Sequence, residues 1–138
     1  MTRSSLTPSA NTPRVVLVDT DGRVIQRLRL VLLTLHPEWE IHLAGSGEEV
    51  LHLLAERPFD AVVTDVALPG MSGMGLLGQI AVRHPETLRV LHPSPIDTGN
   101  PNSVRFLAHY VLARPARIEE IAKLSRFILD GRAAQACA

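Results

Sequence analysis

The chain has few residues that could form a covalent or metal cross-link, because its 138 residues include one cysteine, Cys137. A single thiol can neither close an intrachain disulfide nor bind a metal alone, so we expect a fold held by its core in a reducing cytoplasm. Net charge is also lacking, since 14 Lys and Arg balance 14 Asp and Glu. Without an excess of positive charge, nucleic acid is not an expected partner.

Long apolar runs are missing as well. The uninterrupted apolar segments span only a few residues, far short of the roughly 20 that a membrane helix needs. Residues 1–13 are rich in Ser, Thr and Pro and lack the apolar core of a signal peptide, so we expect a disordered N-terminal arm there and a flexible tail over residues 131–138. The hydrophobic content of 46% is sufficient for one folded domain, expected at residues 14–130, with no room for a DNA-binding output domain.

Short apolar runs alternate with segments of helical spacing along this domain. Strands are expected at 14–18, 39–44, 61–64, 88–92 and 110–113, and helices at 24–35, 46–56, 73–82 and 118–129. Ser46 and Glu49 form a capping-box pattern at the start of the second of these helices. Alternating β and α elements predict a parallel sheet with helices on both faces, and the number of units is typical of the flavodoxin-like, doubly wound α/β fold with strand order 2-1-3-4-5.

The helix expected between the fourth and fifth strands is the weak element. Gly99, Asn100 and Pro101 fall in its first turns. Inside a helix Pro costs about 3 kcal/mol and Gly about 1 kcal/mol relative to Ala. We therefore expect a short or unwound fourth helix, with a loop over residues 95–103 and any helix confined to residues 103–108.

The stretch from residue 60 to residue 77 carries the most specific pattern. An apolar strand ends on Asp65, Pro69-Gly70 predicts a turn, and Gly73 opens a segment of helical spacing. An acid at the end of a buried strand lies where doubly wound sheets bind ligands. With Met71 also in register, the stretch resembles the phosphoacceptor segment of the receiver domains of bacterial response regulators.

The resemblance extends from residue 14 to residue 130 and implies a site. Asp65 would accept a phosphoryl group in phosphorelay signal transduction, with Mg²⁺ bound by the side chains of Asp19, Asp65 and Asp21 and by the backbone carbonyl of Ala67. Receivers have two adjacent acids after the first strand, and here the second of these positions is Thr20. Asp21 is one position further on, where it would point in a different direction, so we expect Mg²⁺ to bind weakly or not at all.

Three other parts of the receiver pattern are altered. The serine or threonine after the fourth strand is replaced by Pro93, with Ser94 one residue away as a substitute hydroxyl. The Lys-Pro pair after the fifth strand is Arg114-Pro115, in which a planar fork replaces a compact ammonium and Pro favours a cis bond. The aromatic switch residue is Val111.

The resemblance implies partners and, as enzymatic activity, at most self-phosphorylation and dephosphorylation of Asp65. Upstream we expect a sensor histidine kinase or a phosphotransfer protein, and downstream a signalling protein. Either of two modes fits: phosphotransfer to Asp65, or protein–protein interaction by a degenerate receiver. Both would use the face formed by the fourth helix, fifth strand and fifth helix, which could also form a homodimer. Neither a membrane nor nucleic acid is expected as a partner.

A second family remains as an alternative. Residues 17–22 also resemble the signature of haloacid-dehalogenase-like phosphatases, in which Asp19 would be the nucleophile and Asp21 the general acid. This alternative leaves Asp65 and its flanking motif unexplained. His92 lies nearest to the expected site among the six histidines, and we interpret it as the end of the fourth strand.

Overall fold

The computed structural model describes residues 12–94 and 107–136, without the side chains of 135 and 136. The predictions for a disordered arm over residues 1–11 and for the loop at 95–103 therefore lie outside the described residues. Pro13, which we assigned to the arm, is already buried, and its carbonyl accepts a hydrogen bond from the Glu40 N–H at 2.9 Å. The ordered domain thus begins before residue 14.

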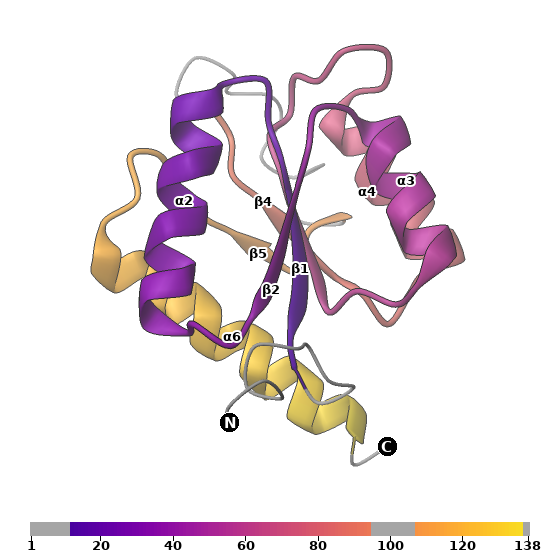
Figure 1. Ribbon diagram of the computed structural model, residues 1–138. Helices are drawn as coiled ribbons and strands as arrows, with labels where there is room; N and C mark the ends of the chain where they lie inside the picture. Colours follow the sequence, from indigo (N-terminus) through magenta and orange to yellow (C-terminus); the bar gives the residue numbers. More distant parts are fainter. Residues whose placement is uncertain (1–11, 95–106, 137–138) are drawn as a thin grey trace, which may run out of the picture.

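Five parallel strands form one sheet in the order β2-β1-β3-β4-β5, which confirms the predicted fold class (Figure 1). The strands are β1 (Arg14–Val18), β2 (Glu40–Ala44), β3 (Ala61–Thr64), β4 (Leu88–Leu91) and β5 (Tyr110–Val111). β1 and β3 have the predicted bounds, and the other three are one or two residues shorter than predicted. Within the described ranges, no helix combines the length and the apolar character that crossing a membrane would require.

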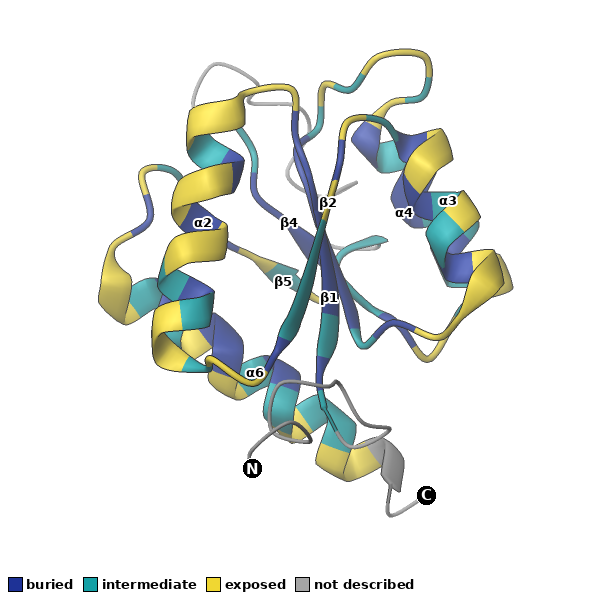
Figure 2. Cartoon of the chain, viewed as in Figure 1, coloured by how far each residue is buried: buried dark blue, intermediate teal, exposed yellow. Residues whose placement is uncertain are grey.

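Helices cover both faces of this sheet (Figure 1): α2 (Gly22–Leu35) and α6 (Ile118–Ala136) lie on one face, α3 (Gly47–Glu56) and α4 (Gly73–Arg83) on the other. Alternate residues of β1 serve the two layers. Val15 and Leu17 pack with α2 and α6, and Val16 and Val18 with α3 and α4. The central strands are therefore buried on both sides (Figure 2), which explains their uninterrupted valines.

Side-chain caps determine where three helices begin. Asp21, Ser46 and Ser72 each accept a hydrogen bond from a backbone N–H in the first turn of α2, α3 and α4. The predicted cap at Ser46 is confirmed, although Glu49 reaches back to the N–H of Gly45 and not to that of Ser46. Capping therefore commits the side chain of Asp21 to the start of α2.

The last helix differs from the prediction, because α6 continues to Ala136 and does not end near Asp130. Gly131, interpreted as the start of a flexible tail, lies inside the helix beside Leu88. A Cβ at residue 131 would come within 2.7 Å of the Leu88 Cδ1 atom. Arg132 then forms an ion pair with Asp60 at 2.8 Å. Contacts with strand β4 and with the residue before β3 thus extend the helix.

Candidate functional site

Parallel strands end at the same edge of a sheet, and this edge brings together the residues that follow β1, β3, β4 and β5. Asp19 follows β1, Asp65 follows β3 and His92 follows β4, and all three are buried. Arg114 follows β5 and reaches the same place with a side chain that is only 10% exposed. Residues from distant parts of the sequence therefore form one cluster.

Asp65 has both carboxylate oxygens engaged. Its Oδ1 atom accepts hydrogen bonds from the backbone N–H of Val66 at 2.7 Å and of Ser94 at 3.0 Å. Its Oδ2 atom lies 3.5 Å from the guanidinium of Arg114. The bond from Ser94 comes from its backbone N–H, and the predicted role of its hydroxyl towards a phosphoryl group stays a prediction.

The loop that carries Asp65 packs tightly against the start of α4. The N–H of Gly73 donates to the carbonyl of Val66 at 2.7 Å. A Cβ on Gly73 would lie 1.8 Å from the carbonyl oxygen of Asp65, which is far inside van der Waals contact. Only glycine allows this approach, and the turn at Gly70 with φ of +78° precedes it. The Pro69-Gly70 and Gly73 positions thus shape the loop after Asp65.

Arg114 contacts both acids of the cluster. The same guanidinium nitrogen forms an ion pair with Asp19 Oδ2 and lies 3.5 Å from Asp65 Oδ2. Its Nε donates to the carbonyl of His92 at 3.0 Å, and the Arg114–Pro115 peptide bond is cis, as predicted. The remaining oxygen of Asp19, Oδ1, accepts from the N–H of Asp21 at 2.8 Å. A single arginine thus provides the positive charge shared by two buried carboxylates.

The side chain of Asp21, another predicted metal ligand, is used outside this cluster, although its backbone N–H contacts Asp19. The Asp21 side chain is exposed and caps α2 through a bond from the Arg23 N–H at 3.0 Å. Thr20 is exposed, and Ala67 is exposed in the loop between β3 and α4. Asp19 and Asp65 are brought together as expected, whereas the carboxylate of Asp21 is used elsewhere.

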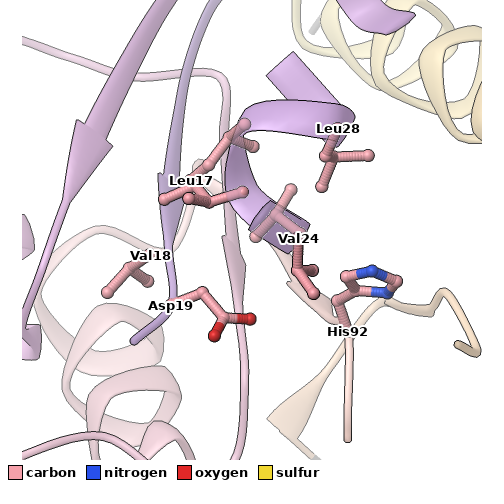
Figure 3. A pocket seen from close by; sticks show the side chains of 8 residues that line it. Leu17, Val18, Asp19, Val24, Leu28 and His92 are labelled. Carbon is pink, nitrogen blue, oxygen red and sulfur yellow. The ribbon is translucent and has the colours of Figure 1, made fainter. Parts of the chain in front are cut away.

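His92 is the site residue that sequence reasoning underestimated. It is buried, its Nδ1 donates to the Leu112 carbonyl at 2.5 Å, and with Asp19, Val24 and Leu28 it lines a small pocket (Figure 3). Burial lowers the pKa of His92 and Arg114 lowers it further, against the opposing effects of the Leu112 bond, Asp19 and Asp65. The signal available in the sequence was its position directly after β4. Asp19 and Asp65 likewise directly follow strands that end at this edge.

A second histidine, His109, joins β4 to the start of β5. Its backbone N–H donates to the Arg89 carbonyl at 2.7 Å, and its ring Nδ1 accepts from the Arg89 N–H at 2.9 Å. This acceptor role requires an unprotonated Nδ1. Burial lowers the pKa of His109, and the charge of Arg89 adds to that effect.

We therefore expect the free energy of unfolding to fall as the pH is lowered below about 6.5, the ordinary pKa of histidine. Both histidines have lowered pKa values in the fold, so the unfolded chain takes up protons first and acid favours it. Their contribution is complete above about pH 6.5 and is lost as the pH falls towards their lowered pKa values. Urea unfolding at several pH values across this range measures the slope of the free energy of unfolding against pH. His92→Gln should flatten it and His52→Gln, on an exposed part of α3, is the control; an unchanged slope in His92→Gln would contradict the assignment.

Comparison with known proteins identifies the architecture around this cluster. A family model for the response regulator receiver domain matches residues 15–124. This chain belongs to that family. The matched range begins within β1 and includes Asp19, Asp65, His92 and Arg114, and it ends within α6.

Relatives of known function match parts of the receiver. The response regulator protein PilR of Pseudomonas aeruginosa is 32% identical over 74 residues, which cover 54% of this chain and 16% of that protein. The DNA-binding transcriptional regulator NtrC of Escherichia coli is 48% identical over 40 residues, 29% of this chain and 8% of that protein. The chain thus spans a small fraction of the length of these relatives.

Solved structures share the fold over most of the chain. The signal receiver domain of an HD domain-containing protein from Pseudomonas fluorescens superposes with a TM-score of 0.83 at 26% identity, covering 94% of this chain and 96% of that one. A CheY-like receiver domain from Methanospirillum hungatei gives 0.79 at 17% identity, over 90% and 99% of the two chains, and supports the fold alone. The phosphatase alternative is not favoured, because Asp21 serves as a helix cap and the family match explains Asp65.

Receivers typically use Mg²⁺, and the residues present here do not offer it a ready coordination set. Hard cations need several free oxygen ligands. Each carboxylate oxygen of Asp19 and Asp65 already lies against a backbone N–H or the Arg114 guanidinium. Across residues 12–94 and 107–136, no group of three or more His, Cys, Asp or Glu side chains is arranged to hold a metal ion.

Proposed function

We propose that this chain is an atypical receiver module that binds its signalling partner whether or not Asp65 carries a phosphoryl group. Its partners would be a sensor histidine kinase or phosphotransfer protein upstream and a signalling protein downstream, both in the cytoplasm, and it would catalyse no turnover of its own. The carrying observation is that Arg114 already engages the carboxylates of Asp19 and Asp65. Because Arg114 already pairs with both acids, the site needs no bound ligand to hold its charged side chains together.

The route from Asp65 to the β5 side of the molecule supports this proposal. Pro93 has no hydroxyl with which to follow a phosphoryl oxygen, and Val111, 46% exposed on β5, has no ring to turn inward. The neighbouring aromatic side chain, Tyr110, packs against Phe127 of α6 with ring centroids 4.9 Å apart. This contact holds Tyr110 against α6, so it is poorly placed to replace the missing switch residue.

Asp65 remains the residue that would accept phosphate, because it follows β3 and precedes the loop shaped by Gly70 and Gly73. With Mg²⁺ and a small phosphodonor such as acetyl phosphate, any adduct of about 80 Da on the intact protein should disappear in Asp65→Asn. Intact-mass spectrometry provides the measurement. An adduct that persists in this variant would move the acceptor elsewhere, with Asp19 the first candidate.

Binding without a switch predicts that phosphorylation leaves partner affinity unchanged. The binding reaction is either that with the upstream kinase or the self-association of the chain through the β5 and α6 face. Titration or sedimentation measures it with and without the phosphodonor. We expect the two dissociation constants to agree within a factor of about three, less than 1 kcal/mol of coupling. A tenfold change, about 1.4 kcal/mol, would instead establish a phosphate-driven switch.

A further inference from the structure

Two buried acids at one edge of a sheet require a positive charge. The side chains of Asp19 and Asp65 are 6% and 7% exposed, and a buried charge without a partner is strongly unfavourable. In a receiver that uses Mg²⁺, the metal ion would supply positive charge at this place. Here the same terminal nitrogen of Arg114 contacts the Oδ2 atoms of both acids.

The backbone around the site holds Arg114 in this position. Its Nε donates to the carbonyl of His92, and the imidazole of His92 donates to the carbonyl of Leu112, two residues before Arg114. His92 is therefore hydrogen-bonded both to the Arg114 side chain and to the segment after β5 that carries Arg114. Since the guanidinium is planar, a bond at Nε also fixes the direction of the terminal nitrogens.

We infer that Arg114 is the resident cation of this receiver and occupies the place of the divalent metal, so that Mg²⁺ and the guanidinium compete for the Oδ2 atoms of Asp19 and Asp65. This inference rests on the proposed function in taking that pair as the receiver site. Thr20 and the capping role of Asp21 complete the replacement, because among the described residues no third carboxylate joins Asp19 and Asp65 to attract a metal against Arg114. Arg114 thereby neutralises part of the negative charge of Asp19 and Asp65 without a bound metal.

Competition makes a prediction about metal binding by the full chain. In the parent protein, thermal unfolding should be the same in MgCl₂ as in NaCl of equal ionic strength. Arg114→Met should unfold at a lower temperature in EDTA and should gain stability from Mg²⁺. At about ten times its dissociation constant, a ligand that binds only the folded state raises the midpoint by roughly 4 °C for a domain of this size.

Arg132→Met is the matched control, because Arg132 pairs with Asp60 at the opposite edge of the sheet. Its loss can destabilise the fold and should create no response to Mg²⁺. Direct metal binding is measured with Mn²⁺ alone, by the loss of the free-ion electron paramagnetic resonance signal. We expect Mn²⁺ to bind Arg114→Met at least tenfold more tightly than the parent, and Thr20→Asp to increase affinity more in that background than in the parent.

Arg114→Lys covers the case in which the Met variant does not fold, since it retains the charge and replaces the fork with a single ammonium. It should bind Mn²⁺ at least tenfold more tightly than the parent, because lysine lacks the separate Nε donor whose bond to His92 directs the terminal nitrogen at both carboxylates. Equal Mn²⁺ affinity in the parent and the folded variants would overturn the inference. The partner measurement is independent of this titration, so a phosphate-driven change in partner affinity would sink the proposed function alone.

Discussion

Replacing Gly73 with alanine should unfold the protein or cost it about 3–5 kcal/mol, a range reserved for severe steric conflict. The added Cβ would meet the carbonyl oxygen of Asp65 at 1.8 Å and its carbonyl carbon at 2.8 Å. Both are backbone atoms, so no side-chain rotation relieves the contact. The loop after β3 or the start of α4 would have to move, and the bond from the Gly73 N–H to Val66 would be lost with it.

Gly78 provides a control in the same helix, where an added Cβ has nothing within 4 Å. Gly78→Ala should stabilise the protein by about 0.5–1 kcal/mol, because alanine is the better helix former. Urea unfolding followed by circular dichroism measures both variants. If Gly73→Ala were as stable as the parent, the packing of α4 against the Asp65 loop would be incorrect.

The sheet could be predicted because its information is local. Strands β1 and β3 contain apolar runs that are buried on both faces, and each strand is followed by an acid and then by a helix signal. Parallel strands bring their ends to one edge, so the proximity of Asp19 and Asp65 followed from the topology. The Gly73 position followed from the receiver motif, although the reason for it, a close backbone approach, needed coordinates.

The rest of the site depends on side-chain geometry between distant residues. Arg114 and Asp19 are 95 positions apart in the sequence, and no local pattern states which acid the arginine contacts. His92 was interpreted only as a strand end, because its bond to Leu112 joins the residues that follow β4 and β5 and leaves no local pattern in the sequence. The length of α6 depended likewise on the contacts of Gly131 with Leu88 and of Arg132 with Asp60.

The stability of the charged cluster should respond asymmetrically to substitution. Arg114→Met leaves two buried carboxylates facing each other without a cation, and removing one partner of a buried ion pair costs about 3–5 kcal/mol. Asp19→Asn instead leaves one acid for one arginine. The amide oxygen of an asparagine there can still accept from the Asp21 N–H, so the loss should remain near 1 kcal/mol, the value of an ordinary hydrogen bond.

A double variant, Arg114→Met with Asp19→Asn, makes the cause of this asymmetry measurable. It should be more stable than Arg114→Met alone, because one of the two unpaired charges is gone, and the coupling energy should lie between about 1 and 3 kcal/mol. Urea unfolding near neutral pH in EDTA provides all four free energies. Additive losses would mean that Arg114 stabilises the fold through packing and its bond to His92. A large coupling would show that the fold depends on the charge of Arg114, and would explain how a receiver keeps Asp19 and Asp65 buried together without calling on a metal.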